Sequence, residues 1–439
     1  MDLGFELTGD YRILLANDLK DFMVKTYEAN FRAKGGVGSS PKVVLGDVAG
    51  LEFDGLEADV VIGGPPCQDF SVLRAATAER QGIAVRRGRL YAHFVRALVR
   101  LKPKAFVFEN VPGLVTANRG VAYKVILEDL ANLELRWDEV KRCLNKGAAD
   151  PKVPSYRLIF KDVVNASHFG VPQNRKRLII VGVRSDLAAG RNPLELSLIF
   201  RRAMGKGRMS FKKFPLTCLE AFEGRPLPDL QDVYREVMKE YDGVWLAVNS
   251  KAAWEWKSGV WDRLTFDIVE DYLTLNSIEG EEIELAFKDH EEVLRELGYY
   301  GVRVSDLKLP DGSCSPPPEP REVKEKMRMI PPGENFAFAV GTKWELRRKG
   351  VSQIYRRIHP LKPSYTIVGY GGGGMAVYHY SRSRSALSSR EKARLQTFPD
   401  SFTFVGSYSD MKAEIGEAVP PLLAKRLAEA LTATLRALE

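Results

Sequence analysis

The chain has 439 residues, which is enough for two or three domains that each bury a sizeable core. Hydrophobic residues make up 45% and charged residues 28%, as in ordinary globular proteins, and no apolar run approaches the roughly 20 residues of a membrane span. We therefore expect a cytoplasmic protein with no membrane partner. The formal net charge of +8 favours a polyanionic partner only weakly, because a merely basic surface would give the same value.

The cysteine pattern argues against two kinds of small-domain scaffold. The four cysteines lie far apart and form no C-x-x-C pair: Cys67, Cys143, Cys218 and Cys314. This spacing disfavours a zinc knuckle and a disulfide framework, and it favours a reducing compartment. We expect no metal site, and any single cysteine remains a candidate reactive thiol.

The first part of the chain, residues 1–187, alternates strand-like and helix-like segments. Apolar and periodic runs predict, in chain order, a strand at 11–18, a helix at 18–31, a strand at 58–64, a helix at 89–101, and strands at 104–111 and 177–183. Strands that alternate with amphipathic helices are typical of a parallel sheet covered on both faces. We therefore predict an α/β, doubly wound domain.

The pattern changes at residues 188–350, where the regular alternation is lost. This region contains a basic run at 201–213, several tryptophans and a polyproline stretch at 313–320, which predict a second, smaller and irregular domain. We expect residues 351–439 to return to the first domain. Leucines at four-residue spacing predict that the chain closes with a helix at 420–438.

Reactive side chains follow or precede three of the predicted strands. Cys67 follows the rigid turn Gly-Gly-Pro-Pro after the second strand, and Glu109 ends the strand FVFE. Arg175 and Arg177 precede the next strand at a spacing of two, which places them on one face. Taken alone, Cys67 suits either a buried structural cysteine or a nucleophile, and Glu109 suits a salt bridge or an acid above a bound ring. A thiol, a carboxylate and guanidinium groups at one sheet edge together indicate a site.

Six sequence blocks resemble, in order, those of the DNA (cytosine-5) methyltransferases. They are GGPPCQDFS, FVFENVPGL, GVPQNRKRLIIVG, RRIHPLKPSYTI, RLQTFPDSF and IGEAVPPLLAKRLAEAL. The resemblance covers nearly the whole chain outside residues 188–350. It implies a Rossmann-like S-adenosylmethionine-dependent methyltransferase domain, into which a target-recognition domain is inserted at 188–350.

The resemblance also implies a role for each catalytic candidate. Cys67 would add to C6 of a cytosine flipped out of the duplex, which makes C5 nucleophilic. Glu109 would hold N3 and the exocyclic amine of that base and assist its protonation. Arg175 and Arg177 would support the cytosine O2 and the geometry of the site.

The cofactor expected from the resemblance is S-adenosylmethionine. Asp18 would bind the ribose hydroxyls, and Leu19 would pack on the adenine. Asp47 would accept from the adenine amine, and Val48 would line the ring. The remaining pocket residues implied in the same way are Pro65, Leu90, Glu417 and Val419. Without the family, Asp18 and Asp47 are equally well explained as helix caps.

Two DNA contacts are implied as well. Residues 68–89 match the family's mobile loop, whose arginines suit phosphate contacts, although a solvated basic loop has the same composition. The tryptophans of residues 188–350 fit base reading, yet each one taken singly is better explained as core.

The chain departs from the family pattern in two places. The family opens with a strand and a turn of the form F-x-G-x-G-G, whereas this chain begins at the following segment, MDLGFELTG. The first strand of a doubly wound sheet lies in its middle, so its absence would leave unpaired backbone groups. We therefore expect that an upstream segment has been lost or that Met1 is a misassigned initiator. The second departure is Glu417, which stands where asparagine is usual.

These observations predict a DNA (cytosine-5-)-methyltransferase that acts on a specific double-stranded DNA sequence. We expect the modification enzyme of a restriction–modification system, monomeric on DNA, with a possible cognate endonuclease for the same site. Two alternatives remain open at this stage. One is a tRNA cytosine-5 methyltransferase, which shares the PPCQ and ENV blocks, and the other is a catalytically impaired DNA-binding relic.

Overall fold

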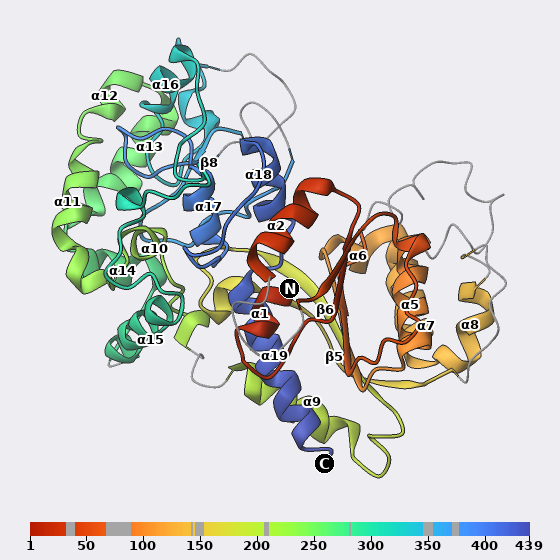
Figure 1. The fold of residues 1–439 in the computed structure, drawn as a ribbon. Coiled ribbons are helices and arrows are strands. Elements are labelled where there is room, and N and C mark those ends of the chain that lie inside the picture. The colour runs from red at the N-terminus through yellow and green to blue at the C-terminus, as the bar shows by residue number, and fades with distance from the viewer. Residues whose placement is uncertain are drawn as a thin grey trace. The chain divides into compact units, whose positions relative to one another are not determined.

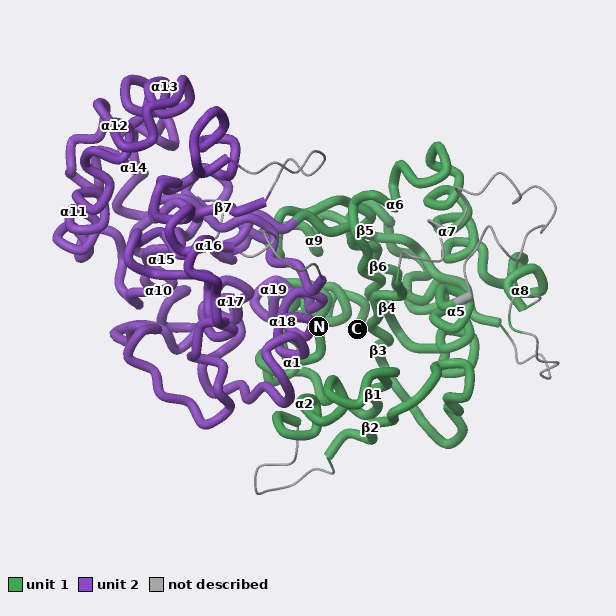
Figure 2. The backbone as a smooth tube through the Cα atoms, turned by 90° about the horizontal axis from the view of Figure 1, so that it is seen from above, with its two compact units in different colours: residues 1–165, 176–206, 424–439 green, residues 166–175, 207–423 purple. Residues whose placement is uncertain are grey.

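The computed structural model describes residues 1–31, 40–66, 89–141, 144, 153–205, 210–280, 282–345, 354–370 and 377–439. Cys67 and nearly all of the arginine-rich loop at 68–89 lie outside these residues. The chain forms two compact units (Figure 2). Unit 1 comprises residues 1–165, 176–206 and 424–439, and unit 2 comprises residues 166–175 and 207–423. The predicted domain boundaries at 187 and 350 stay a prediction.

Unit 1 is built around β-strands that form two sheets. Strands β1 (Leu15–Asp18) and β2 (Lys42–Leu45) pair in parallel. The second sheet has the order β3-β4-β6-β5, with β3 (Val60–Gly63) parallel to β4 (Ala105–Asn110). Within the described residues, β1 and β3 form no ladder with each other, so the sheet is interrupted between them. The predicted absence of a family strand stays a prediction.

The expectation of a parallel sheet is wrong for one strand, β6. Strand β6 (Lys176–Arg184) runs antiparallel to both β4 and β5 (Tyr156–Asn165). Only residues 166–175 connect β5 to β6, and a parallel neighbour would need a crossover of a dozen or more residues. The short connection therefore makes β5 and β6 an antiparallel pair, and the sheet is mixed.

Helices cover both faces of the β3-β4-β6-β5 sheet, as Figures 1 and 2 show, with α5, α7 and α8 on one side and α9 and α19 on the other. The α/β class is thereby confirmed. The helices of this unit are α1 (Asp2–Glu6), α2 (Asp21–Phe31), α5 (Arg89–Leu101), α6 (Gly113–Thr116), α7 (Val121–Ala131), α8 (Leu133–Lys141), α9 (Pro193–Gly205) and most of α19 (Pro421–Arg436). The predicted helix at 89–101 is therefore confirmed. Its Phe94 and Leu98 pack with Phe106 and Phe108 of β4 in one buried core.

Unit 2 is mainly helical, with one short parallel strand pair. Its elements are α10 (Cys218–Glu223), α11 (Gln231–Lys239), α12 (Val244–Val248), α13 (Lys251–Gly259), α14 (Ile268–Asn276), α15 (Glu282–Glu296), α16 (Arg321–Met327), β7 (Arg356–Arg357), β8 (Val377–Tyr378), α17 (Ser389–Leu395) and α18 (Tyr408–Glu417). Trp256 and Trp261 are buried and stack at 5.1 Å, as the core explanation predicts, whereas Trp254 is 51% exposed. No helix in the described ranges has the length and apolar character that crossing a membrane requires.

Candidate active site

The carboxylate of Glu109 lies at the end of the most deeply buried strand. Ala105 to Phe108 of β4 are fully buried, and the side chain of Glu109 that follows is only 13% exposed. The Nε atom of Arg177 on the neighbouring strand β6 lies 2.8 Å from its Oε1 atom. A charged pair with so little exposure is held more firmly than a surface pair, so the carboxylate has a defined position.

The turn after β3 approaches this carboxylate closely. A Cβ atom at Gly64 would lie 2.6 Å from Oε2 of Glu109, a distance that real Cβ atoms do not show. Glycine at this position therefore lets the chain that leads to Cys67 pass directly beside Glu109. Gly64 thus makes room for an acid of the protein itself.

Asn110 holds the same turn from the side of β4. Its Nδ2 atom donates a 2.8 Å hydrogen bond to the carbonyl oxygen of Pro65, and the residue is buried. Asn110 is not among the residues for which the sequence predicted a role. Its residue type is the available signal. A buried side-chain amide needs hydrogen-bond partners, and at the end of a strand the neighbouring turn can supply them.

The two arginines predicted to share one face have separate partners. Arg177 lies within β6 in unit 1 and pairs with Glu109. Arg175 precedes β6, lies in unit 2 and is buried. Its guanidinium group donates to three backbone carbonyls, those of Ile367, Gly416 and Ala418, at 2.8–2.9 Å. Strand β6 begins at Lys176, one residue after Arg175, and the prediction that the two arginines share one face stays a prediction.

The predicted cofactor acids lie at one edge of the β1–β2 pair. Asp18 is opposite Leu45 in the parallel register, so both strands end together, and Asp47 follows two residues later. Each carboxylate also accepts a local backbone hydrogen bond of 2.8 Å, Asp18 from Lys20 N and Asp47 from Ala49 N. The capping explanation is therefore correct for Asp47, which caps the 3-10 turn Val48–Gly50, whereas Asp18 accepts its bond ahead of the first residue of α2, Asp21.

The other predicted pocket residues are distributed over both units. Leu19 is 71% exposed beside Asp18, and Val48, Pro65 and Leu90 are half-buried in unit 1. Glu417 ends α18 and is exposed, and Val419 is buried; both belong to unit 2. The donor set suits an adenosyl group, because carboxylates at the carboxyl ends of parallel strands accept from ribose hydroxyls and from an amine.

Comparison with known proteins identifies the class. The family model of C-5 cytosine-specific DNA methylases matches residues 1–199 and 281–433, and the chain belongs to this family. The resemblance found in the sequence is confirmed: the chain is a DNA (cytosine-5) methyltransferase. The family and the fold imply S-adenosylmethionine as the methyl donor.

Individual relatives place the chain more closely. It is 52% identical to the DNA (cytosine-5-)-methyltransferase M.ApeKI of Aeropyrum pernix, across 100% of this chain and 97% of the relative. It is 30% identical to the type II methyltransferase M.BbvI of Brevibacillus brevis, across 97% and 83%. A prophage-encoded E. coli structure described as a DNA modification methyltransferase shares the fold with a TM-score of 0.53 at 18% identity, covering 99% of this chain and 95% of that one.

Proposed function

We propose that this enzyme methylates C5 of one cytosine within a specific sequence of double-stranded DNA, and that Glu109 holds the flipped base. The observation that carries the proposal is the buried Glu109–Arg177 pair beside the turn at Gly64. Cytosine presents N3 and an exocyclic amine on one edge. A carboxyl group of fixed position can accept from the amine and share a proton with N3, and Arg177 sets that position.

The thiol of Cys67 is the proposed nucleophile, although it lies outside the described residues. Its sulfur forms a bond to C6, and the electron pair of the C5–C6 double bond moves into the ring while Glu109 assists protonation at N3. When bound, S-adenosylmethionine supplies an electrophilic methyl group for C5. When a base removes the C5 proton, the electron pair of that C–H bond re-forms the C5–C6 double bond. The C6–S bond breaks, and its electron pair leaves with sulfur as thiolate. Asn110 supports these steps by holding Pro65, two residues before the thiol.

The proposed cofactor site consists of the residues that the family resemblance implies. Asp18 and Leu19 serve the ribose and adenine, and Asp47 and Val48 serve the adenine amine and ring. Pro65, Leu90, Glu417 and Val419 complete it. The ends of β1 and β2, which lie side by side and bring Asp18 near the start of the turn at Asp47, support this assignment. Arg175 is proposed to act on the site through backbone carbonyls at residues 367, 416 and 418.

A restriction–modification role is the finer proposal. M.BbvI and other relatives are named as type II methyltransferases, and these names support the same biology for this chain. We propose that residues 188–350 read the recognition sequence, that the enzyme acts as a monomer on DNA, and that a cognate endonuclease recognises the same site. Exposed Trp254 supports nucleic-acid contact by this region.

The test is transfer of a labelled methyl group from S-adenosylmethionine to unmethylated duplex DNA and, in parallel, to tRNA. The expected result is label in DNA as 5-methylcytosine. Cys67→Ala should abolish transfer and leave DNA binding intact, whereas Cys314→Ala, at a half-buried cysteine of unit 2, should leave both unchanged. Label in tRNA alone would contradict the proposed substrate, and transfer by the Cys67→Ala variant would contradict the nucleophile.

A further inference from the structure

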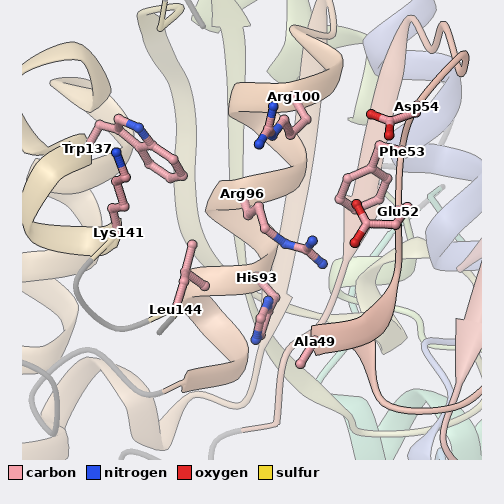
Figure 3. A pocket seen from close by; sticks show the side chains of 10 residues that line it. All are labelled: Ala49, Glu52, Phe53, Asp54, His93, Arg96, Arg100, Trp137, Lys141 and Leu144. Atoms are coloured by element: carbon pink, nitrogen blue, oxygen red, sulfur yellow. The ribbon is translucent and has the colours of Figure 1, made fainter. Parts of the chain in front are cut away.

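A buried arginine ties helix α5 to the turn that follows β2. Arg96 is 9% exposed, and its two terminal nitrogens donate to the carbonyl oxygens of Leu51 and Val48 at 2.8 and 2.7 Å. Its guanidinium carbon also lies 5.1 Å from the centre of the Phe53 ring. Figure 3 shows the side chain extending from the helix toward the segment that carries Ala49 and Phe53. One side chain thus contacts the segment from Val48 to Phe53 at three points.

The turn held by Arg96 is short and has little stability of its own. It is a single 3-10 turn, η1 (Val48–Gly50), capped by Asp47 at one end and by the Leu51 amide, which donates to Val48 O, at the other. Isolated turns of this length are marginal in water. The carbonyls that Arg96 binds belong to the first residue of the turn and to the residue directly after it, so its fork geometry fixes both ends at once.

The residues at the start of this turn are those assigned to the adenine. Asp47 uses one carboxylate oxygen to cap η1, which orients the other oxygen, and Val48 is both the proposed floor of the ring and a hydrogen-bond partner of Arg96. Leu90, a further proposed pocket residue, lies on the same helix as Arg96. The position of the adenine site therefore depends on the contact between α5 and η1.

We propose that Arg96 is a positioning residue for the cofactor: it holds Asp47 and Val48 where they recognise the adenine amine and ring. The inference rests on the proposed cofactor assignment, and Arg96 itself is not proposed to touch the cofactor. A residue that merely stabilised the fold would affect all ligands alike. A positioning residue should instead affect recognition of the adenine amine in particular.

The test compares two ligands by isothermal titration calorimetry. S-adenosylhomocysteine carries the amine, and S-inosylhomocysteine replaces it with a carbonyl oxygen. The wild type should bind the adenosyl ligand about tenfold more tightly, the size expected for one hydrogen bond to a charged group. Arg96→Met keeps the packing on Phe53 but removes both donors. This variant should lose most of the preference, while kcat at saturating S-adenosylmethionine stays within about twofold.

Two further variants make the result decisive. Arg96→Lys keeps the charge and one donor nitrogen, so it should retain part of the adenosyl preference. It replaces Arg96→Met in the comparison if that variant folds poorly. Arg100→Met is the matched control, because Arg100 lies one turn further along the same helix face and is exposed (Figure 3); it should bind as the wild type does. If both Arg96 variants keep the wild-type ratio of affinities for the two ligands, the inference is overturned while the assignment of Asp47 stands. A wild type without adenosyl preference would overturn the assignment of Asp47, and the inference with it.

Discussion

The two parts of the sheet in unit 1 are built in different ways. Strand β4 is paired on both edges, by β3 and β6, and Phe106, Val107 and Phe108 are completely buried. Strands β1 and β2 pair only with each other within the described residues, and their side chains are at most half-buried. The first part carries the proposed base-holding acid, and the second carries the proposed cofactor groups.

This difference suggests how the enzyme divides its tasks. The acid that must meet a flipped base with a defined geometry lies on the rigid part, where burial and an ion pair fix it. Asp18 ends β1, and Asp47 and Val48 lie in the turn after β2; Asn17 and Arg96 tie this region together by hydrogen bonds to backbone carbonyls. Changes in the first part should therefore affect chemistry or stability, and changes in the second should affect cofactor affinity.

The largest effect is expected for Glu109→Gln. The amide retains the shape but removes the charge that pairs with Arg177 and the group that shares a proton with N3, so kcat should fall about 10²–10⁴-fold. Glu134→Gln, at an exposed position of helix α8, is the control and should retain full activity. Single-turnover methyl transfer to duplex DNA measures both. Activity of Glu109→Gln within a few-fold of the wild type would remove the acid from the mechanism.

A pair of glycine substitutions tests the contrast in packing. A Cβ atom at Gly182 of β6 would lie 2.3 Å from the Phe106 ring, which is itself packed against Tyr156 at 5.2 Å. Gly182→Ala should therefore lower the free energy of unfolding by about 1–3 kcal/mol through overpacking. Gly50→Ala in η1 meets nothing within 4 Å and should be neutral. Thermal denaturation compares them, and equal Tm values for the two variants would contradict the packing described for β4 and β6.

Asn17→Leu should affect cofactor binding more than catalysis. The Nδ2 atom of Asn17 donates to the carbonyls of Val44 and Gly46, both at 2.9 Å, and so joins β1 to the residue before Asp47. Loss of these bonds should weaken S-adenosylhomocysteine binding by roughly 5- to 10-fold, since each is worth about 0.5–1.5 kcal/mol. Titration calorimetry measures the affinity. A large fall in kcat at saturating cofactor, with affinity unchanged, would reverse the proposed division of tasks.

The smallest effect concerns Glu6, whose Oε1 atom accepts from Ile13 N ahead of β1. Burial raises the pKa of this carboxyl group; the hydrogen bond from Ile13 opposes the shift, and the charge of Asp2 adds to it. A raised pKa stabilises the fold at acidic pH, and this contribution is lost as the pH rises through the folded-state pKa. Glu6→Gln should therefore gain slightly in Tm relative to the wild type at pH 8, but not at pH 4. If the Tm of Glu6→Gln and the Tm of the wild type change with pH in the same way, the predicted effect of Glu6 is contradicted.

Sequence reasoning reached the site through short-range patterns. The strand ends at Gly64 and Glu109, the helix at 89–101 and the acids Asp18 and Asp47 were each visible from local composition and spacing. The structure brings Gly64 to Glu109 and places Asp18 and Asp47 at one edge. It also gives the two arginines different partners, a set of backbone carbonyls for Arg175 and the carboxylate of Glu109 for Arg177.

By itself, the sequence determined the family and the α/β class, since motif order and hydrophobic periodicity are properties of neighbouring residues. Only the tertiary structure decided the direction of β6, the hold of Asn110 on Pro65 and the hold of Arg96 on η1. Each of these depends on a backbone carbonyl or strand edge about 45 or more residues away along the chain. Backbone carbonyls are the same at every position, so no sequence pattern indicates which of them a buried side chain will meet.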